Sequence, residues 1–341
     1  MTLQNNDTVH VVFATDDRYA PFLGVTLQSL IEHINKSRNY CIYILINEIL
    51  QSNVVKIHRI VDNFPNINIK FIFIKEKIAT FNSFYFHQSS LTIAAYYRLL
   101  LPSFIPECKK VVYLDCDLII QSDIANLFDI DIGKNYIGAC PDLGVTYINS
   151  EWIKDIVANM PNRGLFPNEY INSGVLLINL DIMRLEHVED KLIAIAQQRD
   201  LIWQDQDVFN IVCKGRIVYL KSGWNYVMHC YREKELLNMS CCLEKTSIFI
   251  IHFARPGYKP WENIESEYVN LWWFYARKSP FFEGILNYSK GKFSLSFFIV
   301  AFLMYLVIPF PSLKCRFRNR FLNEKKRLKL RNYLKNNYAD K

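Results

Sequence analysis

The beginning of the chain alternates short apolar runs with segments whose apolar residues recur every three or four positions. The apolar runs are VHVVFA (9–14), YCIYILIN (40–47) and INIKFIFI (67–74). Between them, LGVTLQSLIEHI (23–34) and SNVVKIHRIVDNF (52–64) have the spacing of amphipathic helices. Strands that alternate with helices pair in parallel, with the helices over both faces of the sheet. The pattern therefore predicts an α/β protein with a mostly parallel central sheet.

The same alternation continues through the middle of the chain. LTIAAYYRLLLP (91–102) is predicted to be a helix, and VVYLDCDLII (111–120) a near-continuous apolar strand buried on both faces. Further strands are predicted at NYIGAC (135–140), SGVLLIN (173–179) and GRIVYL (215–220). No stretch rich in Pro, Gly or Ser occurs before about residue 288, and no internal repeat is visible. We therefore expect a single domain over residues 1–280.

The charge is distributed unevenly along the chain. Of 40 basic and 33 acidic side chains, residues 312–341 hold 11 and 2, a net charge of +9 within a total of +7. The remaining residues therefore carry 29 basic and 31 acidic side chains, a net charge of −2. A nearly neutral body with a basic tail indicates that the tail meets an anionic surface. It argues against a body that binds nucleic acid.

The nine cysteines form no recognisable pattern. Their number is odd, their spacing is irregular and no C-x-x-C pair occurs, so neither a disulfide framework nor a zinc site is indicated. No signal peptide is visible before residue 9. We therefore expect a reduced, cytoplasmic protein.

The C-terminal segment, residues 281–341, differs in character from the rest of the chain. FSLSFFIVAFLMYLVIPF (293–310) is apolar and aromatic, and basic sequence follows it. Its unbroken apolar core is about 14 to 16 residues long, whereas a spanning helix needs about 20. We expect a helix that lies in the inner leaflet of the plasma membrane, with the basic segment on anionic headgroups. The alternatives are a membrane span, which the positive-inside tendency disfavours, and a core or oligomer helix.

Two aspartates interrupt the apolar run 111–120. Residues i and i+2 of a strand face the same way, about 6.5 to 7 Å apart, so Asp115 and Asp117 can converge on one cation. Cys116 would face away as a buried free thiol. Two carboxylates, a neutral third ligand and ligand phosphates suit Mn²⁺ or Mg²⁺. The D-x-D pattern is common by chance, and strand-end carboxylates that cap a helix or turn are the structural alternative.

Six stretches occur in a fixed order and together resemble a known enzyme family. They are ATDDRYAPFLGV, AYYRLLLP, VVYLDCDLII, INSGVLLINL, WQDQDVFN and HFARPGYKPW. The set is similar to the bacterial family 8 retaining glycosyltransferases over residues 9–277. It implies a GT-A (Rossmann-like) fold, with a nucleotide-binding sheet and a D-x-D metal site in a catalytic domain. Within the family the chain looks most like the lipopolysaccharide core hexosyltransferases, because LWWFYARKSPF precedes an apolar and basic tail.

The resemblance implies a nucleotide site and a metal site. The positions that match the nucleotide site, where a tyrosine stacks on uracil, are Ala14, Thr15, Asp16, Tyr19, Arg98, Asp115 and Cys116. The positions that match the metal ligands are Asp115, Asp117 and His252. Structural alternatives stay open for three of them. TDD is also a helix N-cap signal, Arg98 is also a typical solvated charge, and a lone histidine after SIFII is also a typical core residue.

The resemblance also implies a site for the donor sugar. The matching positions are Asp142, Asn172, Asp205 and Gln206, the last two at the reacting face of the sugar. Asp207 is expected to hold its loop by hydrogen bonds instead. Gly174 in INSG is expected to permit close backbone approach before a buried strand. Purely structural roles for INSG and WQDQD remain the alternative.

The diphosphate site matches the family less closely. Gly257 and Lys259 occupy the matching segment, but Arg255 stands where the family has glycine and the lysine comes one position late. A one-residue insertion, with Gly257 supplying the backbone approach, would explain the late lysine. Arg255 is then either a second phosphate contact or a solvated loop charge. Trp261 is expected to pack beneath Lys259.

The function implied by the resemblance is metal-dependent, retaining hexosyl transfer. The expected donor is UDP-glucose or UDP-galactose, the cofactor Mn²⁺ or Mg²⁺, and the acceptor a glycan or glycolipid such as lipopolysaccharide core. Retention of configuration is compatible with two routes, attack from the same face or a brief covalent adduct with Gln206 or Asp205. Since an amide is a poor nucleophile, we favour same-face attack with Gln206 as an electrostatic support.

Two other classes of protein are the alternatives to this function. A nucleotidyltransferase would bring a glycine-rich phosphate loop near the N-terminus, which TDDRYAPFLG lacks. A non-catalytic sugar-binding protein would have lost a metal ligand, whereas all three candidate ligands are present.

Overall fold

The computed structural model describes residues 8–74, 93–147, 157–198, 201–227, 247–255, 259–262 and 268–290. The chain divides into two units, Met1–Asn287 and Tyr288–Lys341, and the fold below is that of the first. The apolar and basic segments of the tail, with their predicted membrane role, lie outside the described residues. Within the described part of the chain, no helix is long and apolar enough to cross a membrane. The predicted domain boundary at residue 280 stays a prediction.

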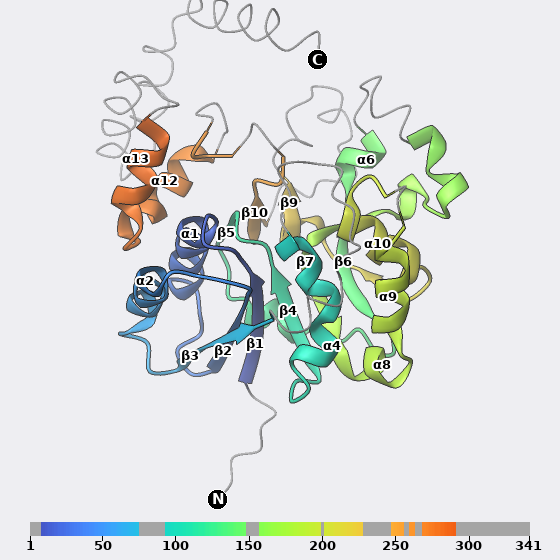
Figure 1. The fold of residues 1–341 in the computed structure, drawn as a ribbon, viewed down its shortest axis with the longest axis horizontal. Helices are drawn as coiled ribbons and strands as arrows, with labels where there is room; N and C mark the ends of the chain where they lie inside the picture. Colours follow the sequence, from blue (N-terminus) through green and yellow to red (C-terminus); the bar gives the residue numbers. More distant parts are fainter. Residues whose placement is uncertain are drawn as a thin grey trace, which may run out of the picture. The chain divides into compact units, whose positions relative to one another are not determined.

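A seven-stranded sheet lies at the centre of the fold (Figure 1). Its strands, in spatial order, are β3 (Ile67–Phe73), β2 (Asn39–Ile46), β1 (Thr8–Ala14), β4 (Lys110–Leu114), β7 (Ile171–Asn179), β6 (Ile137–Pro141) and β8 (Ile217–Tyr219). Neighbouring strands of this sheet are parallel, except for the two pairings that β7 makes. The prediction of a mostly parallel sheet is therefore confirmed, with β7 as its reversed strand.

Helices cover both faces of this sheet, as the alternation predicts (Figure 1). Along β1, Val11 and Phe13 belong to an apolar cluster that also contains residues of α1 (Ala20–Ile31) and α2 (Gln51–Val61). Val12 belongs to a second cluster on the opposite face. The helices there are the 3₁₀ helix η2 (Ile93–Leu100), α4 (Leu101–Phe104), α8 (Leu180–Leu185), α9 (Val188–Ala196) and α10 (Gln204–Val212). Successive strand residues point to opposite faces, so both faces of the strand are buried.

The stretch 111–120 is not one strand, and that prediction is wrong. The chain leaves the large sheet after β4, and β5 (Leu118–Ile120) enters a second sheet of order β5-β10-β9. In it β5 pairs antiparallel with β10 (Ile250–His252), which pairs in parallel with β9 (Tyr226–Val227). The hydroxyl of Thr26 on α1 stabilises the bend, 2.7 Å from the carbonyl oxygen of Cys116. After the bend Asp117 is still buried, and the cost of burying its charge is offset by the ion pair with Lys259.

The described residues of the stretch 91–102 do not form the single helix that was predicted. Residues 93–100 form η2, and α4 follows directly. Pro102 lies in the first turn of α4. Proline has no N–H to donate and fits only the first turn of an α-helix, so one continuous α-helix through this position is excluded.

The remaining described elements complete the fold. They are α5 (Ala125–Phe128), α6 (Leu143–Tyr147), η3 (Pro161–Arg163), η4 (Pro167–Glu169), η5 (Ser222–Asn225), α12 (Val269–Lys278) and α13 (Phe282–Lys290). Trp272 of α12 is fully buried in the apolar cluster that contains α1. The LWWFYAR segment therefore packs on the same face of the sheet as α1.

The cysteines of the described residues are buried free thiols. They are Cys41, Cys108, Cys116, Cys140 and Cys213. That they are reduced stays a prediction.

Candidate active site

The candidate site residues gather at one edge of the large sheet. β1 ends there at Ala14 and β4 ends just before Asp115, while β7 begins there because it runs the opposite way. Val175 of β7 pairs with Leu114, and the Asp115 N–H donates to the Gly174 carbonyl oxygen at 2.9 Å. The INSG segment therefore meets the carboxyl ends of the parallel strands, where α/β proteins bind ligands.

Asp115, Asp117 and His252 form a compact cluster. His252 Nε2 lies 3.3 Å from Asp117 Oδ1 and 3.7 Å from Asp115 Oδ2, and the three ligand atoms lie within 4.8 Å of one another. The small sheet positions the cluster, because His252 pairs with Leu118 and the Phe253 N–H donates to the Asp117 carbonyl oxygen at 3.1 Å. The three predicted ligands are thus brought together, on a bend instead of an extended strand.

His252 is oriented by Asn225, a residue that the sequence pattern does not reveal. Asn225 Oδ1 lies 2.8 Å from His252 Nδ1, and Asn225 Nδ2 donates to Asn172 Oδ1 at 2.8 Å. Since the amide nitrogen donates to Asn172, the amide oxygen faces the histidine and accepts its Nδ1–H. In a neutral ring this leaves Nε2 without a proton, facing the aspartates. Asn225 is only 3% exposed, so this arrangement is shielded from water.

Gly174 makes room for the cluster. A Cβ atom at this position would lie 2.2 Å from His252 Cε1 and 2.7 Å from Asp115 Oδ2. Only glycine leaves that space open, so the imidazole and the carboxylate lie directly against the β7 backbone. The close backbone approach predicted at this glycine is confirmed.

Lys259 reaches the cluster despite its late position in the sequence. Its ammonium forms an ion pair with Asp117 and donates to the carbonyl oxygens of Phe253 and Ala254 at 2.7 and 3.2 Å. Burial by itself raises the pKa of Asp117, but its contacts with the charged Lys259 and with His252 together outweigh burial and hold that pKa below its usual range. Asp117 therefore stays ionised, as a metal ligand must be.

The rest of the HFARPGYKPW segment is described in part. Trp261 stacks on Phe22 with ring centroids 3.7 Å apart, and the Lys259 ammonium lies 5.9 Å from the centroid of Trp261. The tryptophan thus packs next to the lysine, as predicted. Arg255 is exposed, whereas Gly257 lies outside the described residues, so its role at the diphosphate stays a prediction.

Arg98 links the cluster to the WQDQD segment. It is 7% exposed, donates to Asp115 Oδ1 at 2.7 Å and lies 3.2 Å from Asp205 Oδ2, so it is not a solvated helix charge. Burial alone would lower the pKa of Arg98, but the two carboxylates raise it above its usual value, and the guanidinium stays charged. Burial raises the pKa of Asp205 to about 6. The charge of Arg98 opposes this rise, and the charge of Asp115 adds to it.

A hydrogen-bond network joins the residues predicted to hold the donor sugar. Asp142 Oδ2 accepts from Gln206 Nε2 at 3.0 Å and from Asn172 Nδ2 at 3.2 Å. The Ser173 N–H donates to Gln206 Oε1 at 3.2 Å, and the Ser173 hydroxyl donates to Asp205 Oδ2 at 3.0 Å. These side chains are all buried. Ser173 is a member that the motif comparison did not single out, although its place within INSG was a signal.

The loop after β1 holds the residues predicted for the nucleotide. The Thr15 N–H donates to the Leu45 carbonyl oxygen at 3.0 Å, and Asp16 Oδ1 accepts from the Tyr19 N–H at 2.9 Å. Asp16 thus closes the turn that precedes α1, whose N-terminus has no side-chain cap. The Tyr19 ring packs edge-on against Phe22, with centroids 5.5 Å apart. The bond to the Tyr19 N–H is of the N-cap type, and the Ala20 N–H donates to the Asp16 carbonyl oxygen at 3.0 Å, so the N-cap explanation of TDD stands beside the nucleotide role.

Cys116 and Asp17 have structural contacts in the same region. Cys116 Sγ lies 3.2 Å from the Ala14 carbonyl oxygen, and burial raises the pKa of this thiol well above its usual value. Cys116 is therefore a neutral buried thiol, as predicted. Asp17 Oδ1 accepts from the Leu50 N–H and from Asn53 Nδ2, both at 2.8 Å, so the second aspartate of TDD anchors the start of α2.

Asp207 holds the loop before α10. Its Oδ2 accepts from the N–H groups of Ile202 and Trp203 at 2.7 and 3.2 Å, and its Oδ1 accepts from the Tyr170 hydroxyl. The hydrogen-bonding role predicted for this aspartate is confirmed. This anchoring fixes the neighbouring Asp205 and Gln206 at the start of the helix.

The chemistry of the cluster fits a divalent cation. Two carboxylates and an unprotonated imidazole nitrogen are ligands that Mn²⁺ and Mg²⁺ accept in proteins. The ionised state of Asp117 meets the requirement for a deprotonated ligand, and the contact with Asn225 orients the His252 ring. Beside them, the network around Asp142 offers donors and acceptors for a polyhydroxylated ligand. The site can therefore bind a metal-diphosphate group and a sugar side by side.

Comparisons with known proteins agree with this chemistry. A profile of the family described as Glycosyl transferase family 8 matches residues 10–265. A putative glycosyltransferase of Haemophilus influenzae is 29% identical over 257 residues, which cover 74% of this chain and 73% of that protein. A lipopolysaccharide 1,3-galactosyltransferase of Salmonella typhimurium is 25% identical over 195 residues, 55% of each protein.

The fold has a counterpart among solved structures. A crystal structure of an active-site mutant of LgtC covers 80% of this chain and 96% of its own, with a TM-score of 0.66 and 25% sequence identity. The shared architecture is the GT-A type of α/β fold with a mostly parallel central sheet. Because the profile match runs from β1 past β10 and includes the clustered acidic residues, the chain belongs to glycosyl transferase family 8.

Proposed function

We propose that this glycosyltransferase moves a hexose, glucose or galactose, from a UDP-sugar to lipopolysaccharide core or another cell-surface glycan, with retention of configuration. The observation that carries the proposal is the cluster of Asp115, Asp117 and His252 next to the network around Asp142. It offers one set of groups to a diphosphate and another to a sugar. The name of the Salmonella typhimurium relative supports the choice of acceptor.

Asp115, Asp117 and His252 would hold Mn²⁺ or Mg²⁺. When bound, the cation stabilises the negative charge that builds up on the departing diphosphate. Lys259 places a further positive charge beside Asp117, and Gly257 is proposed to bring backbone N–H groups close to the phosphates. The uridine would lie on the loop after β1, against Ala14, Thr15, Asp16 and Tyr19, with Cys116 in the wall of the site.

The sugar would be held by Asp142 and Asn172, whose polar groups can exchange their present hydrogen bonds for sugar hydroxyls. Gln206 and Asp205 lie at the reacting face. As the bond from the anomeric carbon to the phosphate oxygen breaks, an acceptor hydroxyl attacks from the same face and its proton passes to the leaving phosphate. Gln206 supports the positive charge at the anomeric carbon through its amide oxygen. Arg98 contacts both Asp115 and Asp205 and so keeps these two carboxylates in place.

Asn225→Ala is expected to weaken UDP binding in the presence of Mn²⁺ about tenfold or more, because loss of the partner of a metal-binding histidine costs about 10- to 100-fold. The His252 ring would lose its Nδ1 acceptor and its fixed orientation. Calorimetric titration with UDP checks this. Asn135→Ala is a matched control, since Asn135 bonds the Ile132 carbonyl oxygen before β6, at the opposite edge of the sheet. Equal affinities for both variants would contradict the orienting role.

The raised pKa of Asp205 predicts a pH dependence. Below about pH 6 this carboxylate takes up a proton and loses its charge interaction with Arg98, so UDP-sugar hydrolysis should fall about tenfold per pH unit. Profiles of kcat/KM from pH 5 to 8 test this, and Asp205→Asn should remove the inflection. A wild-type profile that stays flat to pH 5 would argue against it.

The raised pKa of Asp205 also makes the free energy of unfolding depend on pH, in the direction opposite to that of the activity. Between about pH 4 and pH 6 the native state binds a proton at Asp205 that the unfolded chain has released. The contribution of this group to the free energy of unfolding is therefore present at low pH and is lost as the pH rises through 6. Denaturant titrations of the wild type and Asp205→Asn over this range measure it.

The tail is proposed to hold the enzyme at the cytoplasmic face of the inner membrane, near a lipid-linked acceptor. Truncation before residue 293 should leave UDP-sugar hydrolysis unchanged but lower both vesicle binding and transfer to a membrane-embedded acceptor. Co-sedimentation with vesicles that contain anionic lipid measures the binding. Equal sedimentation of the truncated and full-length proteins would remove the anchoring proposal and leave the catalytic one standing.

A hydrolysis panel tests the proposed function as a whole. Purified protein is incubated with UDP-glucose, UDP-galactose and UDP-N-acetylglucosamine, with Mn²⁺ or with EDTA, and released UDP is measured. We expect release from UDP-glucose or UDP-galactose that EDTA abolishes. No metal-dependent release from any of the three sugars would contradict the proposal.

A further inference from the structure

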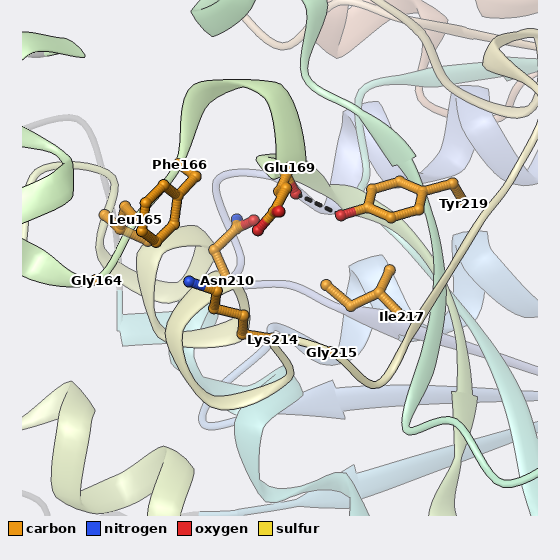
Figure 2. A pocket seen from close by; sticks show the side chains of 9 residues that line it. All are labelled: Gly164, Leu165, Phe166, Glu169, Asn210, Lys214, Gly215, Ile217 and Tyr219. Carbon is orange, nitrogen blue, oxygen red and sulfur yellow. Dashed lines mark hydrogen bonds between the residues drawn. The ribbon is translucent and has the colours of Figure 1, made fainter.

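A hollow lies in the surface among residues that are not part of the metal-binding cluster. It has a volume of about 310 Å³ and lies between η4, the C-terminal end of α10 and the start of β8 (Figure 2). Its principal side chains are Phe166, Glu169, Asn210, Lys214, Ile217 and Tyr219. Apart from Asn210, which ends the WQDQDVFN stretch, neither the family resemblance nor the proposed chemistry uses any of them.

Two aromatic rings border the hollow and are open to solvent. Phe166 is 40% exposed and Tyr219 is 49% exposed. The Tyr219 hydroxyl donates to the Glu169 carbonyl oxygen at 2.9 Å, which ties β8 to η4 and fixes the ring at the mouth (Figure 2). Exposed aromatic rings at a concave surface are typical of ligand sites, because each offers a flat apolar face.

The polar groups of the hollow are divided between its floor and its rim. On the floor, Asn210 is saturated: its Oδ1 accepts from the Ile171 N–H at 2.8 Å, and its Nδ2 donates to the carbonyl oxygens of Ile171 and Gln206, both at 2.9 Å. At the rim, the Lys214 ammonium lies 3.5 Å from the centroid of Phe166. Glu169 is exposed, and neither it nor Lys214 has an ion-pair partner within the described part of the chain. The rim therefore offers a donor and an acceptor to a ligand.

This combination of groups suits a sugar ring better than a phosphate or an apolar ligand. A pyranose has C–H faces that pack on an aromatic ring and hydroxyl groups that both accept and donate hydrogen bonds. Lys214 can donate to one hydroxyl while Glu169 accepts from another. A phosphate would be repelled by Glu169, and a purely apolar ligand would make no hydrogen bond with either charged group.

The hollow and the candidate active site share two elements, α10 and the segment that leads into β7. Asn210 lies one helical turn, about 6 Å, beyond Gln206 on α10. Glu169 lies three residues, at most about 10 Å, before Asn172 at the start of β7. A glycan whose terminal hydroxyl lies at Gln206 could therefore place a neighbouring unit in the hollow.

We propose that this hollow binds a pyranose unit of the acceptor glycan, away from the unit that is glycosylated. The inference rests on the proposed function for the identity of the glycan. It makes Phe166, Lys214 and Tyr219 determinants of acceptor length and not of donor choice.

Saturation-transfer NMR tests the binding, with lactose, maltotriose and lipopolysaccharide core oligosaccharide as the probes. The wild type is compared with Tyr219→Ala and Lys214→Ala. Phe73→Ala is the matched control, because Phe73 is an exposed aromatic residue on β3. We expect binding of at least one probe, at least about tenfold weaker in both hollow variants and unchanged in the control. Lys214 makes no hydrogen bond to the residues that the structure describes, so its variant keeps the test valid if Tyr219→Ala unfolds.

UDP-sugar hydrolysis by the same preparations separates the two proposals. If hydrolysis occurs but all variants bind the probes equally, or if no probe binds, the acceptor subsite is wrong and the proposed function stands. If hydrolysis is absent from the wild type but both hollow variants still lose probe binding, the hollow is a saccharide site and the proposed function is wrong.

Discussion

Asp117→Asn is expected to lower UDP-sugar hydrolysis and transfer in the presence of Mn²⁺ about a hundredfold or more, since loss of one charge-stabilising group typically costs that much. Asparagine keeps the shape of the side chain but removes the charge that faces His252 and Lys259. The remaining ligands would hold a divalent cation weakly. Initial rates over a range of Mn²⁺ concentrations measure the effect, and added Mn²⁺ should restore activity only in part.

An aspartate at the opposite edge of the sheet provides the control. Asp131 is exposed and, among the described residues, accepts from the Gly133 N–H alone, at 2.8 Å in the turn before β6. Asp131→Asn should therefore keep wild-type rates. Circular dichroism verifies that both variants fold. If Asp117→Asn retained activity within a few-fold of the wild type, the assignment of the metal site would be wrong.

Gly174→Ala is the second change with a large expected effect. The new methyl group would lie 2.2 Å from His252 Cε1, a distance that no packing tolerates, so the imidazole must move off the aspartates. We expect Mn²⁺-dependent hydrolysis to fall about a hundredfold, with some loss of thermal stability from the strained packing at β7. Activity assays and thermal unfolding followed by circular dichroism measure the two effects.

Gly284 offers a matched control, because a Cβ there meets nothing within 4 Å. Gly284→Ala lies in α13 and should be neutral or slightly stabilising, as alanine is preferred to glycine in helices. A Gly174→Ala variant with wild-type hydrolysis and a wild-type melting temperature would mean that the cluster tolerates displacement of His252. The geometric role given to this glycine would then be untenable.

The sheet and its helices could be predicted because each depends on local periodicity. VHVVFA and YCIYILIN carry their strand signal within a few residues, and β1 and β2 form where expected. The bend at Asp115 could not be predicted, because it depends on Thr26 of α1 and on the pairing of β5 with β10 far along the chain. The reversal of β7 is likewise invisible in SGVLLIN, which is as apolar as a parallel strand.

The candidate site could be predicted where a residue type carries the chemistry. Asp115, Asp117 and His252 are chemically conspicuous, and they meet in the structure. Asn225 was missed because asparagine is common in turns, and only its contact with His252 distinguishes it. Lys259 comes one position later in the sequence than the family pattern places its lysine. Its ion pair with Asp117 shows that this spacing still lets the ammonium contact the cluster.

Calorimetric titration of the wild-type protein with UDP tests the central claim most directly, namely that this cluster binds a metal-diphosphate group. The titration is done once with saturating Mn²⁺ and once with EDTA. Binding of one UDP per chain, at least about tenfold tighter with Mn²⁺, is the predicted result. Equal affinity under both conditions, or no binding under either, would contradict the claim that Asp115, Asp117 and His252 form the metal site of a UDP-sugar glycosyltransferase.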